Sequence, residues 1–456
     1  MSRDDIGTVN RRKFLGTSMA VGIGALAGCS GGTETATLQF MTDQSAPESQ
    51  DVFESAFDEW AETRDEDVES EFQYLGFEEV WQQAGQQLEA GSPPDLLLMR
   101  VGETSQFGLA GHLSDLSGVI DAIDIDIPDR MLVEFDGDSV YLAHDVDQPS
   151  QFYRTDIYDD AGVEPGSTWE EDLETLSTLD ENLDEMDPML VLANDASGPT
   201  QWFHDTHFWG NGVHYVERDG GDLNVTIDQE PYRERAIETL EYLQQKYQYS
   251  PASFDYSWGE LIDTFATEQV ATTHYVGRLV SSVAESAPEV YNNMAAAPDP
   301  VAPLAEAGDA DYVMRGTSNG FSVPAEADNA DLAKDFLEYF MNNWYTDSLL
   351  AVPIHKVPVN LNILDSDAFQ EHELVQENQE YVEYVKEWND SVVWIQNRTE
   401  PATPFLNGLT NGSGAIPTMI SSTLLGEAEP GEAVDAAADE LRDLIENEFS
   451  DQVDQL

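Results

Sequence analysis

The stretch SPPDLLLM, residues 92–99, decides the fold class. Two prolines close the element before it, and an uninterrupted run of apolar side chains follows Asp95. A short apolar run between turn signals is typical of a buried strand in a parallel sheet, because a strand that is covered on both faces needs no polar alternation. We therefore predict a buried β-strand over Asp95–Met99.

The segments around this strand alternate between strand and helix patterns. Strands are predicted at 36–41, 68–75, 140–143 and 270–276, and helices at 49–63, 77–88, 172–179, 232–247, 259–267, 330–344 and 431–449. Strands that alternate with helices predict an α/β sheet with helices on both faces.

The N-terminal stretch NRRKFLGTSMAVGIGALAGCSGG, residues 10–32, predicts export. Its apolar part, 16–27, is shorter than the roughly 20 residues that span a bilayer. Basic residues before a short apolar run are typical of a signal peptide, and the pair Arg11–Arg12 indicates the twin-arginine route. Cys29 follows Leu26, Ala27 and Gly28 as in a lipobox, so we expect a signal peptide over 1–28, a lipid on Cys29 and a flexible tether over 29–36. The alternative is an ordinary helix with a buried cysteine.

The charge balance is strongly acidic. Asp and Glu number 90 against 19 Lys and Arg, which gives a net charge of −71. Such a chain repels nucleic acid and anionic lipid, since both bind through Lys and Arg. The acidic residues are dispersed, and their mutual repulsion is screened in molar salt, where the Debye length is about 3 Å. We therefore expect a halophilic protein. We interpret Asp-rich stretches such as 121–129 as solvated surface, because they lack the ligand spacing of a calcium loop.

A series of motifs resembles the extracellular solute-binding lipoproteins of ABC importers, family 1, in their sugar-binding branch and of haloarchaeal type. The motifs are SPPDLLLM, GHLSDL (111–116), YRTDIYDDAG (153–162) with TWEE (168–171), FSVP (321–324) and GEAEPGEA (426–433). The third block agrees with the family in order, spacing and residue types together. Arg154 departs from the usual Asn, Arg278 stands where Trp is common, and the Gly-rich 411–414 replaces a segment that often supplies an aromatic.

The resemblance implies a periplasmic-binding-protein-like α/β fold with two lobes joined by a hinge, each lobe a mostly parallel sheet flanked by helices. We expect lobe 1 over 37–146 and 296–343, and lobe 2 over 147–295 and 344–456. The implied function is a non-enzymatic receptor that closes over a sugar and delivers it to ABC permease transmembrane subunits. The implied protein is a monomer without cofactor or metal on the extracellular face of the membrane.

Candidate ligand-binding residues fall into three groups. Side chains beyond predicted strands or at the presumed crossings can meet ligand, since ligands bind outside the carboxyl ends of strands. Aromatic rings stack on the CH faces of sugars, while carboxylates and guanidinium groups hold hydroxyls. The candidates are Asp43, Gln44, Arg100, Glu103, Asp147, Gln148, Trp202, His204, Trp209, Trp258, Tyr275, Arg278 and Asn319.

Each candidate has a structural alternative. The aromatic residues of 201–221 can form a helix core, Trp258 can pack at a helix start, and Arg278 can form a surface ion pair. Asn319–Gly320 reads first as a turn and only second as a ligand contact. His204, His207 and His214 suggest zinc, but no Cys or catalytic Glu accompanies them, so we interpret them as ordinary histidines.

The alternative function is an exported glycoside hydrolase or another carbohydrate-active enzyme. Glycoside hydrolysis needs two carboxyl groups at a defined separation, and 90 acidic residues single out no pair. Few arginines are present to hold an anionic solute, so a neutral sugar is the preferred ligand.

Overall fold

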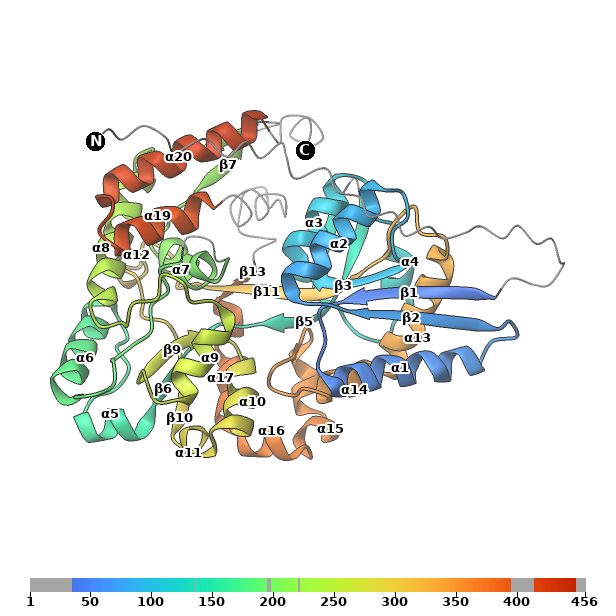
Figure 1. Cartoon of the computed structure of the whole chain (residues 1–456), viewed down its shortest axis with the longest axis horizontal. Helices are drawn as coiled ribbons and strands as arrows, with labels where there is room; N and C mark the ends of the chain where they lie inside the picture. The colour runs from blue at the N-terminus through green and yellow to red at the C-terminus, as the bar shows by residue number, and fades with distance from the viewer. Residues whose placement is uncertain (1–34, 136, 195–197, 220–221, 395–413, 448–456) are drawn as a thin grey trace, which may run out of the picture. The chain divides into compact units, whose positions relative to one another are not determined.

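The computed structural model describes residues 35–135, 137–194, 198–219, 222–394 and 414–447 (Figure 1). The chain divides into the units Met1–Thr35 and Ala36–Leu456, and the fold below is that of the second unit. The predicted signal peptide and Cys29 lie outside the described residues. None of the described helices combines the length and apolar character that a bilayer crossing requires.

An eight-stranded mixed sheet underlies the first lobe, in the order β12-β5-β11-β3-β1-β2, with β4 on β5 and β13 on β11. Strand β1 is parallel to β2 and β3, whereas β11 is antiparallel to β3 and β5. The strands are β1 (Ala36–Thr42), β2 (Val68–Tyr74), β3 (Leu96–Arg100), β4 (Val133–Phe135), β5 (Asp138–Asp147), β11 (Met314–Ser322), β12 (Val357–Pro358) and β13 (Val392–Trp394).

Helices cover both faces of this sheet because its central strands are apolar on both sides. Phe40 and Leu98 face a core that includes Phe53 of α1, whose ring centroid lies 5.2 Å from that of Phe40. Met41 and Leu97 face the other way, against Val80 and Ala84 of α2. Figure 1 shows α2 and α3 on one side of β1–β3 and α1 on the other. The helices of this lobe are α1 (Pro47–Glu62), α2 (Phe77–Glu89), α3 (Val101–Leu109), α4 (Ser117–Ala122), α13 (Ala330–Asn343) and α14 (Tyr345–Leu350).

The second lobe has a smaller, antiparallel sheet in the order β10-β6-β9, and a β7–β8 hairpin. Its helices bury large aromatic rings, as where Trp169 stacks on Tyr242 with ring centroids 4.3 Å apart. The strands are β6 (Ser150–Arg154), β7 (Val216–Asp219), β8 (Asp222–Val225), β9 (Thr272–Tyr275) and β10 (Met294–Ala297). The helices are α5 (Thr155–Ala161), α6 (Trp169–Asn182), α7 (Gly198–Gly210), α8 (Tyr232–Tyr247), α9 (Trp258–Ala266), α10 (Arg278–Ser286), α11 (Pro288–Tyr291), α12 (Pro303–Glu306), α19 (Ala415–Leu424) and α20 (Pro430–Asn447).

The chain passes between the lobes through short segments. Strand β5 ends at Asp147 and β6 begins at Ser150, so only Gln148 and Pro149 link them. Strand β11 runs the other way, from its pairing with β13 at Met314–Gly316 to its pairing with β3 at Asn319–Ser322. Short helices follow β12, namely α15 (Asp367–Gln370), α16 (Glu373–Glu377) and α17 (Gln379–Trp388).

The two-lobed α/β fold is confirmed, but the expectation of mostly parallel sheets is wrong. Strand β11 enters the large sheet from the second lobe, so it opposes its neighbours β3 and β5. In the second lobe both neighbours of β6 run antiparallel to it. Strand direction depends on how the chain returns between lobes, which local patterns do not encode.

The interpretation of Asn319–Gly320 as a turn is also wrong, because both residues lie inside the buried strand β11. A Cβ atom at Gly320 would overlap the Tyr141 ring and lie 2.5 Å from the carbonyl oxygen of Leu142. The glycine therefore permits a close approach between β11 and β5. A register shift between Asn319 and Gly320 marks the same place.

Candidate ligand-binding site

Arg100 forms the centre of a cluster that joins candidates from distant parts of the sequence. It ends β3 and precedes α3, at the carboxyl edge of the parallel strands, with 21% of its side chain exposed. Its guanidinium carbon lies 5.0 Å from the ring centroid of Trp202 and 5.1 Å from that of Trp258. These distances are typical of cation–π contacts.

Trp202 lies in the second turn of α7, and Trp258 is the first residue of α9. Their ring centroids lie 4.8 Å apart in an edge-to-face arrangement. Ser257 caps α9 reciprocally with Glu260, which fixes the place at which Trp258 leaves the loop. Trp202 is 3% exposed, and the guanidinium carbon of Arg315, from β11, also lies 5.0 Å from its centroid.

Carboxylates gather where β5 leaves the first lobe. Asp145 accepts a hydrogen bond of 2.7 Å from Asn319 Nδ2 and pairs at 2.6 Å with His144 Nδ1. Although burial opposes it, the bond from His144 lowers the pKa of Asp145. Asp147 is buried, and its Oδ2 atom lies 3.9 Å from Arg100 Nη2.

The pKa values of Asp147 and Asp43 move in the opposite direction. Burial raises the pKa of Asp147 to about 6, with the charges of Asp145 and Asp43 adding to the rise and that of Arg100 opposing it. Burial likewise raises the pKa of Asp43, which accepts a hydrogen bond of 3.2 Å from Gln44 Nε2. A carboxylate that is costly to ionise gains most when a hydroxyl or a cation approaches it.

Tyr275 and Arg278 flank Gly277 at the start of α10. Tyr275 is buried, with its ring centroid 6.0 Å from that of Trp258, and burial raises its pKa to about 12. Arg278 is exposed, and among the described residues no carboxylate lies within ion-pair distance of it. The surface ion pair that was the alternative for Arg278 is therefore not formed within the described part of the chain.

The remaining candidates occupy other positions in the two lobes. His204 is buried inside the second lobe, with its Nε2 atom 2.9 Å from the carbonyl oxygen of Leu192. Trp209 is buried further along α7, and Gln148 is buried in the link between β5 and β6. Glu103 lies in α3.

The structure adds polar residues that sequence reasoning did not select. Gln201 Oε1 and Trp202 Nε1, at neighbouring positions of α7, are buried and have no hydrogen-bond partner among the residues that the structure describes. Arg315 of β11 lies 3.5 Å from Asp205 through its Nε atom. The sequence around position 315 does not indicate a ligand-binding residue, because the place of Arg315 depends on β11 crossing between the lobes. Together these groups surround aromatic ring faces with hydrogen-bond donors and acceptors, which suits a polyhydroxylated solute.

The three histidines of the zinc hypothesis do not meet. His214 Nδ1 pairs with Glu217 at 2.6 Å, while His204 and His207 lie inside the lobe with ring centroids 6.4 Å apart. Within the described ranges, no group of three or more His, Cys, Asp or Glu side chains has the arrangement of a metal site.

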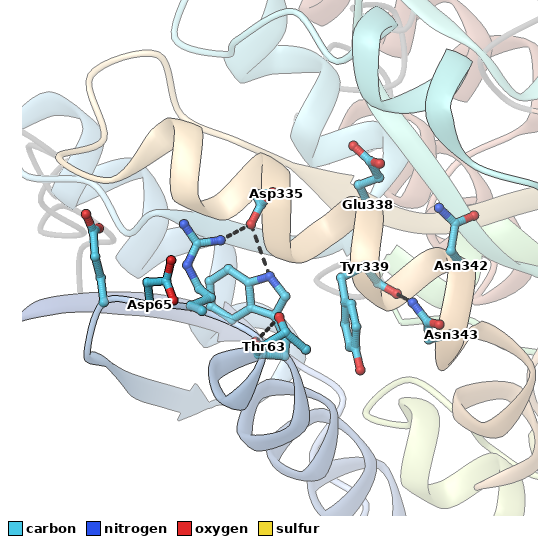
Figure 2. A pocket seen from close by; sticks show the side chains of 10 residues that line it. Thr63, Asp65, Asp335, Glu338, Tyr339, Asn342 and Asn343 are labelled. Carbon is cyan, nitrogen blue, oxygen red and sulfur yellow. Dashed lines mark hydrogen bonds and ion pairs between the residues drawn. The ribbon is translucent and has the colours of Figure 1, made fainter.

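A polar groove of about 530 Å³ lies elsewhere, between the end of α1 and helix α13 (Figure 2). Asp335 accepts hydrogen bonds from Trp60 Nε1 at 3.1 Å and from Arg64. Figure 2 shows Asp335, Glu338 and Tyr339 on α13, with Thr63 and Asp65 opposite them. No candidate ligand-binding residue lines this groove, and the Arg64 guanidinium covers the Trp60 ring at 4.8 Å.

A family model described as bacterial extracellular solute-binding protein matches residues 46–343, which is more than half of the chain. The protein therefore belongs to this family of solute-binding proteins. A search of curated proteins finds no significant match.

Several solved structures share the fold. The GacH receptor of Streptomyces glaucescens, solved unliganded and with acarbose, has a TM-score of 0.72 at 18% identity, covering 91% of this chain and 99% of that one. A solute-binding protein from Thermotoga lettingae with bound α-D-tagatose scores 0.71 at 18% identity, covering 90% and 100%. UgpB from Mycobacterium tuberculosis, in complex with glycerophosphocholine, scores 0.72 at 17% identity, covering 91% and 100%.

Proposed function

We propose that this protein is the substrate-binding component of an ABC transporter, which captures a sugar or oligosaccharide between its lobes and delivers it to the permease. The observation that carries the proposal is the cluster of Arg100, Trp202 and Trp258 beside the buried carboxylate of Asp147. Ring faces and hydroxyl-binding groups are the two elements that sugar recognition requires. The acarbose and tagatose complexes of similar proteins agree with this ligand class.

The proposed mechanism is a two-state closure. Trp202 and Trp258 belong to the second lobe, whereas Arg100 and Asp43 belong to the first. A solute that contacts both groups binds the closed state better than the open one, and this difference in affinity drives closure. Shifting an equilibrium from 1:99 to 99:1 takes about 5.5 kcal/mol, which lies within the roughly 8 kcal/mol of a micromolar ligand.

The proposed role is binding without turnover. An exported glycoside hydrolase remains the alternative, and it would need two carboxyl groups free to act on one bond. At the cluster, Asp145 is already engaged by His144 and Asn319. This arrangement favours a structural role for Asp145 and supports a receptor over a hydrolase.

The proposal extends to the location of the protein. We propose export by the twin-arginine route, anchoring to the extracellular membrane face through Cys29, function as a monomer and adaptation to high salt. The lobe limits, 37–146 with 296–343 and 147–295 with 344–456, stay predictions. Helix α14, residues Tyr345–Leu350, packs against α1 and α13 of the first lobe.

A thermal-shift screen of the full chain in molar KCl tests this function. The solutes are maltose, acarbose, D-tagatose and glycerophosphocholine, each at increasing concentration. A ligand at about 100 times its Kd stabilises the folded state by about 2.7 kcal/mol, so a saccharide should raise the Tm. A shift with glycerophosphocholine alone, or product release from any saccharide, would contradict the proposal.

A further inference from the structure

We propose that His355 contacts the bound solute, as a hydrogen-bonding group that is presented by a strained turn. This inference rests on the proposed function and adds a specificity-determining residue to that site. No motif or periodic pattern in the sequence selects His355.

Two contacts place the chain at His355 between candidate site residues. Strand β12 pairs with β5 at Val357↔Val146 and Pro358↔Asp145, so the chain just before Val357 runs toward Asp147 and the link to the second lobe. On its other side, a Cβ atom at Gly277 would overlap the carbonyl oxygen of Ile354. The turn that carries His355 therefore packs against the start of α10, between Tyr275 and Arg278.

Ile354 holds this turn in a conformation that a β-branched residue rarely adopts. Its φ is +71°, in the left-handed region. A non-glycine residue in that region is strained and persists only where its surroundings enforce the conformation. Here the surroundings are Gly277, which leaves room for the Ile354 carbonyl, and Tyr381, whose Oη lies 3.1 Å from the Cβ position of Gly277. Such strain concentrates at ligand-binding sites.

The side chains of Lys356 and His355 have different surroundings. Lys356 points into the first lobe, where Nζ donates to Ser49 Oγ at 3.3 Å and lies 5.6 Å from the Phe53 centroid. His355 lies in the turn that the hydrogen bond from the Lys356 amide to the Val352 carbonyl closes, within range of the charges of Arg278 and Arg100 at the candidate site. It is half-buried, unlike the fully buried Lys356.

The charges around His355 keep it neutral. Burial lowers its pKa to about 3, and the nearby Arg278 guanidinium adds to this effect, as do Lys356 and Arg100, against the charge of Asp145. A neutral imidazole offers one donor and one acceptor, which matches a sugar hydroxyl. It also avoids adding a further cation beside Arg100 and Arg278.

The test compares His355→Ala and His355→Gln in the full chain by calorimetric titration with maltose, acarbose and D-tagatose in molar KCl. We expect the alanine variant to lose about 10-fold in affinity, because truncating one hydrogen-bonding group costs about 1–3 kcal/mol. The glutamine variant, which keeps a donor and an acceptor, should recover most of the loss. His112→Ala, at another half-buried histidine in the loop after α3, is the matched control.

A second measurement covers the case in which a variant does not fold. Diethyl pyrocarbonate should acylate His355 of the wild-type protein, and bound saccharide should protect it, as read by mass spectrometry. Wild-type binding with unchanged affinity in His355→Ala, or without protection of His355, overturns the inference and leaves the proposed function standing. Absence of binding by wild type to all three saccharides overturns both.

Discussion

Asp147 Oδ2 lies 3.9 Å from Arg100 Nη2, at the point where β5 leaves the first lobe. This separation exceeds the 2.7–2.9 Å that is typical of a charge-assisted hydrogen bond. The pair therefore does not offset the desolvation of a buried carboxylate, which agrees with the raised pKa of about 6 for Asp147. The ligand-free site carries a charge that it stabilises poorly, as binding sites often do.

Asp147→Asn should stabilise the protein at pH 7.5 and should stabilise it much less at pH 4.5. The folded-state pKa of Asp147 lies above its ordinary value of 3.8, so ionisation removes stability as pH rises from about 4 to about 6. Above pH 6 the buried, ionised carboxylate lowers the free energy of unfolding by its full amount, on the order of 1–3 kcal/mol, and the uncharged amide of asparagine removes this loss. Thermal melting of both proteins at the two pH values measures the difference. A lower Tm for the variant at pH 7.5 would show that the pairing with Arg100 outweighs desolvation.

Trp258→Ala should weaken saccharide binding by about 10-fold or more, since it removes a ring face and its apolar contact. Trp258→Phe keeps a ring and should lose less. Phe254→Ala is the control, because this aromatic residue of the preceding loop is 57% exposed. Titration calorimetry gives the three affinities. Equal affinity for wild type and Trp258→Ala would remove this ring from the site.

Gly320→Ala should destabilise the fold by about 1–3 kcal/mol or more, because its methyl group would overlap Tyr141 in the packed core. Gly118→Ala is the matched control, since no atom lies within 4 Å of its Cβ position in helix α4. That control should be neutral or stabilising by up to about 1 kcal/mol. Denaturant unfolding in molar KCl measures both. Similar stabilities for the two variants would contradict the close approach of β11 and β5.

The Tm should rise steadily between 0.1 and 2 M KCl, because salt screens the repulsion produced by the net charge of −71. A non-ionic osmolyte at equal osmolarity separates screening from general exclusion effects. The high-salt proposal fails if the Tm is flat across this range or follows the osmolyte alone.

Cys29→Ser should release the protein from the cells, because the thiol is the proposed lipid attachment point. Immunoblots of cell and medium fractions measure this. Paired Lys substitutions at Arg11 and Arg12 should instead block export and leave the protein inside. Retention of Cys29→Ser at the membrane would rule out the lipid anchor.

Local patterns predicted the elements whose burial is continuous or periodic. The strand at Leu96–Arg100 and the helices α1, α8 and α13 lie where the sequence places them. Strand β11 was missed, because its sequence MRGTSNGFS carries glycine and polar residues that read as a turn. Its polar side chains are tolerated in the core through partners from other strands, as Asn319 is by Asp145.

The candidate site was likewise only partly predictable from local sequence patterns. Strand ends and aromatic clusters pointed to Arg100, Trp202 and Trp258, and the structure brings these three together. His204 has the same local character but meets the backbone of Leu192 instead. His355 stands beside a residue whose conformation is set by a glycine 77 positions away. Only the tertiary fold distinguishes these cases.

The link between β5 and β6 limits how the two lobes can rotate relative to each other. Two residues, Gln148 and Pro149, supply its backbone torsions, and the proline ring fixes one of them near −65°. Rotation there must concentrate in few bonds, next to a buried glutamine side chain. Pro149→Gly would make this link more flexible and let the two lobes sample many relative orientations. A solute would then have to select one of these orientations before both lobes could bind it.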